Sequence, residues 1–129
     1  MSQMAIQKEI PMPVDQAIDK VTAAIKEVGF GVLTRIDFDE KMKEKLNETV
    51  ARTVILGACN PKLAFEAFKQ STDVALLIPC NVVVRETTPG CCIVEAIRPS
   101  QMLSFLKEVK QSDLILKAEA DLERVIHAL

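Results

Sequence analysis

The sequence predicts a single α+β domain over residues 1–129, a mostly antiparallel sheet of about five strands with its helices on one face. Two observations lead there. Strand-like segments are interspersed with amphipathic helices, and the last two strands are separated only by the loop 87–90, which indicates a hairpin. The chain is also 49% hydrophobic, enough to bury one continuous core without disulfides or a structural metal.

The first two elements are a strand and a helix. Residues 4–10 alternate apolar and polar side chains, and Pro11 and Pro13 would end that strand. A helix follows, because apolar residues then recur at spacings of four and three: Val14, Ile18, Val21, Ile25 and Val28. Gly29 suits the left-handed position that ends a helix.

Three further segments continue the alternation. Residues 30–38 read as a second strand, 39–46 as a short charged helix with acidic residues in its first turn, and 50–58 as a third strand. A helix over 60–70 is well marked, because Asn60 is a favoured N-cap and Pro61 is tolerated in the first turn.

The C-terminal part supplies the hairpin and two helices. Residues 81–97 form two β-rich runs, and a four-residue loop would place Glu86 opposite Cys91. Helices are predicted over 99–109 and 112–129, each beginning near a serine.

Charge and composition exclude some classes of function. The net charge of −2 is dispersed, and Trp and Tyr are absent, so neither phosphate binding nor base stacking is favoured and we expect no nucleic-acid partner. No export signal or long apolar run appears, so we expect a cytoplasmic protein that does not bind membranes. Four cysteines without C-x-x-C spacing are expected to be reduced thiols.

The hairpin strands carry apolar residues on both predicted faces. The predicted register places Val82, Val84 and Ile93 on one face, and Val83, Val94 and Ala96 on the other. The helices can cover only one face. We therefore expect a homodimer, in which a second copy covers the other face or an edge.

Two segments resemble a known family. "ILGACNPKLAFEAF" followed by "LLIPCNVVVRE" is similar to the signature of the domain of unknown function 302 family, and "VGFGVLTRIDF" and "RPSQML" resemble its flanking segments. The resemblance implies a TATA-binding-protein-like fold: a curved sheet in the order β-α-β-β-β-β-α, here with an extra helix before the final hairpin. It also implies homodimers and no established activity. The acidic charge balance argues against DNA binding by analogy.

The dipeptide Cys-Asn occurs twice, next to a proline each time, and both copies lie at junctions between a strand and a helix. The candidate ligand-binding residues are Cys59, Asn60, Pro61, Pro79, Cys80 and Asn81. A thiol near a helix N-terminus is expected to have a lowered pKa. Buried free cysteines and a capping asparagine are more often purely structural features than binding residues.

These residues suggest two functions. The first is a non-enzymatic small-ligand-binding or regulatory module, with a small molecule or an anion bound near residues 59–61 and 79–81. The alternative is a thiol-dependent redox protein, or a metal- or haem-binding protein, that uses Cys59 and Cys80.

Other chemistry finds less support. A four-ligand zinc site is not predicted, because Cys91 and Cys92 lie far along the hairpin from Cys80 and point to opposite faces. Glu86 and Glu95 are too far apart in the predicted register for a carboxylate pair. No catalytic constellation is recognisable, so the sequence leaves open whether the protein is an enzyme.

Overall fold

The computed structural model describes residues 4–129 and confirms the α+β class. Its five strands form one sheet in the order β1-β5-β4-β3-β2, in which all neighbours are antiparallel. The strands are β1 (Ala5–Ile10), β2 (Gly31–Asp37), β3 (Thr53–Cys59), β4 (Cys80–Thr88) and β5 (Cys91–Ile97). The helices are α1 (Val14–Lys26), α2 (Phe38–Leu46), α3 (Pro61–Gln70), the 3₁₀ helix η1 (Thr72–Leu76), α4 (Pro99–Leu103) and α5 (Asp113–His127).

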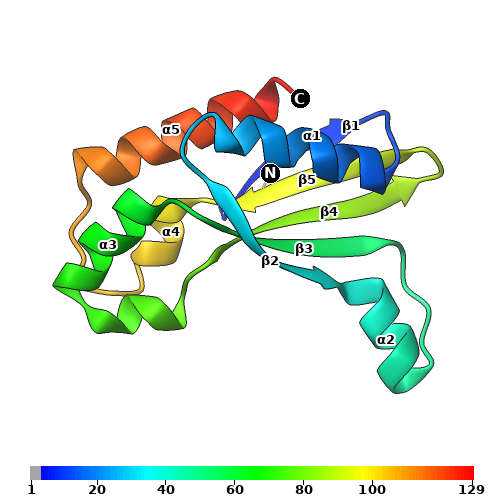
Figure 1. Cartoon of the computed structure of the whole chain (residues 1–129), viewed down its shortest axis with the longest axis horizontal. Coiled ribbons are helices and arrows are strands. Elements are labelled where there is room, and N and C mark those ends of the chain that lie inside the picture. The colour runs from blue at the N-terminus through cyan, green and yellow to red at the C-terminus, as the bar shows by residue number, and fades with distance from the viewer. Residues whose placement is uncertain (1–3) are drawn as a thin grey trace.

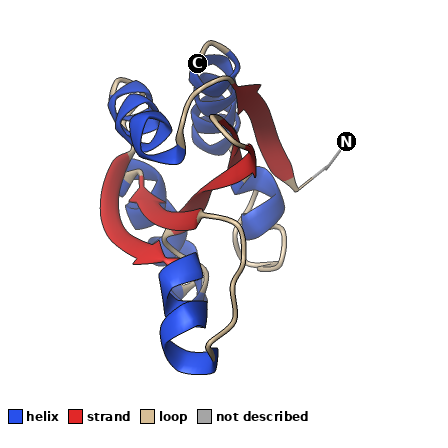
Figure 2. Ribbon diagram, turned by 90° about the vertical axis from the view of Figure 1, so that its right-hand side faces the viewer, coloured by secondary structure: helices blue, strands red, loops and turns tan. Residues whose placement is uncertain are grey.

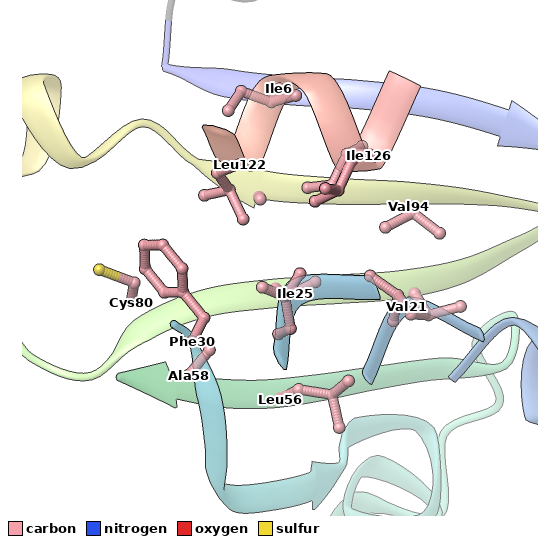
Figure 3. Close-up of a cluster of buried hydrophobic side chains, with 14 of the residues drawn as sticks. Ile6, Val21, Ile25, Phe30, Leu56, Ala58, Cys80, Val94, Leu122 and Ile126 are labelled. Atoms are coloured by element: carbon pink, nitrogen blue, oxygen red, sulfur yellow. The ribbon is translucent and has the colours of Figure 1, made fainter. Parts of the chain in front are cut away.

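Two helices cover one face of the sheet. Figure 1 shows α1 and α5 lying side by side above the strands, with α3 and α4 at one end and α2 at the other. Between α1, α5 and the sheet lies the core, which includes Ile6, Val21, Ile25, Leu56, Val94, Leu122 and Ile126 (Figure 3). Among the described residues, no helix is long and apolar enough to cross a membrane.

The predicted helix signals match the local structure. The apolar stripe of α1 is buried, and Gly29 beyond its end has φ +91°. Asn60 caps α3, because its Oδ1 accepts a hydrogen bond from the Leu63 N–H at 3.2 Å. Ser112 caps α5 in the same way, accepting from the Ile115 N–H at 3.3 Å.

The helix predicted over 99–109 was too long, because α4 ends at Leu103. The chain continues in tight turns, with the Leu106 N–H bonded to the Leu103 carbonyl and the Val109 N–H to the Leu106 carbonyl. Leu103 and Val109 are both buried in the core. Tertiary burial therefore overrides the helical pattern here. The short helix η1 was not predicted.

The predicted hairpin register was also wrong. β4 extends to Thr88 and β5 begins at Cys91, so the turn holds two residues rather than four. A bulge between Glu86 and Thr88 then places Glu86 opposite Cys92 and Thr88 opposite Cys91. The extra residue in one strand shifts the pairing by one position.

This shift changes the faces of the two strands. Val82, Val84, Val94 and Ala96 are all buried on the side of α1 and α5. On the opposite, open face lie the half-buried side chains of Ile55, Val83 and Ile93, beside an Arg85–Glu95 ion pair of 3.2 Å. The open face is therefore partly apolar, as predicted, but Ile93 belongs to it and Val94 and Ala96 do not.

Helix α2 extends away from the rest of the fold. It has no buried residue, and Figure 2 shows it standing below the sheet. Arg52 anchors its base through ion pairs of 3.1–3.3 Å to four carboxylates, those of Asp15, Asp37, Asp39 and Glu40. The hydrogen bond from the Thr53 N–H to Asp39 Oδ1, 3.1 Å, adds a backbone contact.

Candidate functional site

The first Cys-Asn pair lies where β3 passes into α3. Cys59 is the last residue of β3, Asn60 is the N-cap, and Pro61 is the first residue of the helix. The Ala64 N–H also bonds to the Asn60 carbonyl at 2.9 Å. The side chain and the backbone of Asn60 are thus both used to start α3, while Cys59 is left half-buried beside it.

The second pair lies at the start of β4. Cys80 pairs with Ala58 of β3, so the two Cys-Asn segments lie on adjacent strands, a pairing that the sequence did not predict. Pro79 packs against Gly57, where a Cβ would clash with Thr34 Oγ1 and would lie only 2.7 Å from Pro79 Cγ. Glycine at position 57 therefore allows Pro79 to approach the sheet.

Between the end of β3, α3, η1, β4 and α4 lies a small, partly enclosed cavity of about 10 Å³. Its lining is apolar apart from Asn60 and two thiols: Cys59, Asn60, Leu63, Ala64, Ala67, Val74, Ile78, Cys80, Met102 and Leu103. The Cys80 thiol donates to Met102 Sδ at a sulfur–sulfur distance of 3.9 Å. Figure 3 shows Cys80 at the edge of the core, near Phe30. This space is no larger than one water molecule requires.

The thiols differ from the expectation of an activated cysteine. Burial raises the pKa of Cys59, although the residue precedes a helix N-terminus. Burial, and then the neighbouring Cys59, raise the pKa of Cys80 to about 11. Desolvation of the thiolate outweighs the helix dipole here. Both groups are therefore protonated at neutral pH, and the expected pKa lowering was wrong.

A second hollow, called the open groove below, also borders Asn60. It has a volume of about 430 Å³ and joins the end of α1, the start of α3 and one side of α5. It is lined by Val28, Gly29, Asn60, Pro61, Lys62, Leu114, Lys117, Ala118 and Asp121. Lys117 is paired with Asp121 at 3.1 Å. A neighbouring hollow of about 460 Å³ shares Lys62 and Leu114 with this groove.

The structure divides the six candidate residues. Cys59, Asn60 and Cys80 line the small cavity, and Asn60 and Pro61 line the open groove. Pro79 and Asn81 line neither of these two hollows. Pro79 packs on Gly57. Asn81 is exposed on β4, where it pairs with Gly57 of β3.

Two arginines of the last strands and their flank are held in ion pairs. Arg85 pairs with Glu95, and Arg98 pairs with Glu123 at 2.6 Å and with Glu119 at 3.6 Å. Within residues 4–129, no three His, Cys, Asp or Glu side chains converge on one point.

Sequence reasoning missed several lining residues. Met102 supplies a third sulfur to the cavity, and Lys117 and Gly29 complete the groove. Met102 lies 22 residues beyond Cys80, and Lys117 lies 55 residues beyond Lys62. No local pattern connects positions so far apart; only the packing of α4 and α5 against α3 brings them together.

Comparisons with known proteins identify a family. The model described as "Domain of unknown function DUF302" matches residues 6–129. The crystal structure of an uncharacterised conserved protein DUF302 from Bacillus stearothermophilus is similar, with a TM-score of 0.77 and 22% sequence identity. That match covers 97% of this chain and 94% of the other. No curated protein matches.

Proposed function

The chain belongs to the domain of unknown function 302 family, and from its own geometry we propose that it is a homodimeric, non-enzymatic module that binds a small organic anion. The observation that carries the proposal is the open groove of about 430 Å³ where α1, α3 and α5 meet. Ligand sites typically have volumes of about 300–1,000 Å³.

The groove combines apolar surface with positive charge. Val28, Leu114 and Ala118 provide the apolar part. Lys62 leaves the groove with a net positive charge, because Asp121 in the lining balances Lys117. The N-terminus of α3 opens on to it, and the partial positive charge there favours an anion. A carboxylate attached to a short apolar body matches this lining better than a fully polar or a fully apolar ligand.

Benzoate is a suitable probe, titrated into labelled protein and followed by the chemical shifts of backbone amides. We expect saturable shifts at Gly29, Lys62 and Lys117, and an affinity about tenfold lower for Lys62→Met, because one charge-assisted contact is lost. Lys45→Met on α2 is the matched control and should bind as the parent does. Shifts that do not saturate, or that are equally large in Lys62→Met, would contradict the proposal.

The homodimer is supported by the open face of the sheet. Ile55, Val83 and Ile93 are only half-buried there, and Ile36 at the adjoining edge strand is 47% exposed. β2 is the edge of the sheet, with no residue fully buried. A second copy that packs on this face would remove the apolar surface from water.

Light scattering at micromolar concentration tests the dimer. The expected mass is twice the 14.3 kDa of one chain. Ile36→Glu should shift the protein toward a monomer, because it places a charge in the proposed interface, whereas Leu76→Glu, at an 83% exposed site on η1, should not. A monodisperse monomer of the parent protein would refute the dimer.

The alternative, a thiol-based function, receives uneven support. A redox thiol is disfavoured because burial raises the pKa of Cys59 and of Cys80. A cavity of about 10 Å³ does not admit a haem. Of the forms of this alternative, binding of a single soft metal ion is the one that the cavity volume does not exclude. The free thiols also suit a reducing compartment, which supports our proposal of a cytoplasmic protein.

A further inference from the structure

We propose that a second copy of the chain covers the open face of the sheet with its helix α2, which packs at the β1 edge, and that each subunit does this to the other. This inference rests on the homodimer proposed above and names the segment that makes the contact. α2 suits this role, because it has no buried residue and extends below the sheet, on the side away from α1 and α5 (Figure 2).

The open face by itself is small for a stable interface. Five strands about 4.8 Å apart, each with about six residues of roughly 3.3 Å, span only about 500 Å². Each partner in a standard interface buries about 800 Å². α2 adds nine residues on the same side of the sheet, so a copy that covers the open face also meets this helix.

The apolar surface of the open face continues onto α2. Ile36 lies on the open face of β2, where it pairs with Ile55, and is 47% exposed. Phe38 and Met42 follow on α2 at a spacing of four residues, which puts them on one side of the helix. Neither is a member of the core. The first two turns of α2 therefore extend the apolar part of the proposed interface beyond the sheet.

The register of the sheet identifies what α2 meets on the partner. β2 ends at Asp37, so α2 begins level with the next row across the sheet, which consists of Thr53, Arg85, Ile93 and Glu9. Packed sheets keep their strands nearly aligned. A two-fold axis parallel to the strands then reverses the strand order of the partner and sets each row against the same row. The first turns of α2 lie beside Ile93 and Glu9 of the partner subunit.

The charges match in this arrangement. Glu9 on the open face and Lys43 beside Met42 are both exposed, and within residues 4–129 neither forms an ion pair. Their neighbours are occupied: Arg85 pairs with Glu95 at 3.2 Å, and Lys41 pairs with Glu44 at 3.4 Å. An ion pair between Lys43 and Glu9 of the partner subunit forms twice in a two-fold dimer. Such complementary charges fix the relative orientation of two surfaces.

The test is a charge swap, with the dimer dissociation constant of the full chain measured by sedimentation equilibrium. Lys43→Glu and Glu9→Lys should each raise that constant about tenfold or more, because each sets two like charges together on both sides of the axis. The double variant should return to within about threefold of the parent. Lys20→Glu, at an exposed site on α1, makes the same charge change on the opposite side of the sheet and should leave the constant unchanged.

A second measurement uses the parent protein alone. Carbodiimide joins a lysine to a carboxylate that it contacts, so a mixture of isotope-labelled and unlabelled chains should yield a Lys43–Glu9 link between the two kinds of chain. A monomeric parent would refute the homodimer itself. A dimer that lacks this link, that is unaffected by both single variants, or that the double variant does not restore would overturn only the α2 contact.

Discussion

The two ends of the sheet are stabilised by different interactions. At one end, α3, η1 and α4 close over an apolar cavity in which the only polar side chains are Asn60 and two protonated thiols. At the other end, α2 has no buried residue and is anchored by Arg52 and its four carboxylates. The first end depends on packing, and the second on electrostatics near the surface.

This difference has a functional meaning. A tightly packed end holds its side chains in fixed relative positions. A protruding helix held by charges can adapt to a neighbouring surface, and surface ion pairs contribute little to global stability. The hydrogen bond from Arg35, together with Arg52, holds the pKa of Asp37 well below its usual range, so this carboxylate of the α2 anchor keeps its charge at acidic pH.

The largest expected effect tests the packed end. Leu103 is 1% exposed and lines the cavity, so Leu103→Ala should lower the free energy of unfolding by about 2–5 kcal/mol. Leu46→Ala, at a 65% exposed site on α2, should change it by less than about 0.5 kcal/mol. Urea titration of both variants measures the contrast. Equal losses would show that α2 is packed as firmly as α4.

An intermediate effect concerns alkaline pH. Cys80 has a folded-state pKa of about 11, above the value of about 8.5 for an exposed thiol. The contribution of the neutral Cys80 thiol to the free energy of unfolding is fully present below about pH 8.5. It is lost as the pH rises toward 11, by up to about 1.4 kcal/mol per pH unit, because the unfolded chain ionises first. Chemical denaturation across this range should show a shallower decline for Cys80→Ala than for Cys91→Ser. Parallel declines would mean that Cys80 ionises freely in the fold.

The smallest expected effect tests the charged end. Arg52→Met leaves Asp37 and Asp39 without this partner and should cost roughly 1–2 kcal/mol, discounted because the cluster is partly solvated. Hydrogen exchange should accelerate at the amides of α2 and at Thr53, with no change in α4. Lys45→Met, on α2 itself and outside the Arg52 cluster, is the matched control. Uniform acceleration across the chain would contradict a local role for Arg52.

Local signals predicted the elements of this fold well, since each reports a short-range interaction. The stripe of α1, the cap at Asn60 and the left-handed Gly29 all depend on neighbours within a few residues. The hairpin register depends on one bulge between Glu86 and Thr88, and no residue between Glu86 and Cys91 indicates that bulge in the sequence. A shift of one position then exchanged the faces predicted for β5.

The sequence alone therefore placed both Cys-Asn segments at strand–helix junctions, whereas the sheet topology made their strands adjacent. Their surroundings were decided only by tertiary packing. α4 brings Met102 Sδ to 3.9 Å from Cys80 Sγ, and α5 brings Lys117 to the groove beside Asn60. Burial raises the pKa of Cys59 and of Cys80, which a helix N-terminus was expected to lower. Desolvation and contacts between distant segments arise only when the chain is folded, so no local pattern encodes them.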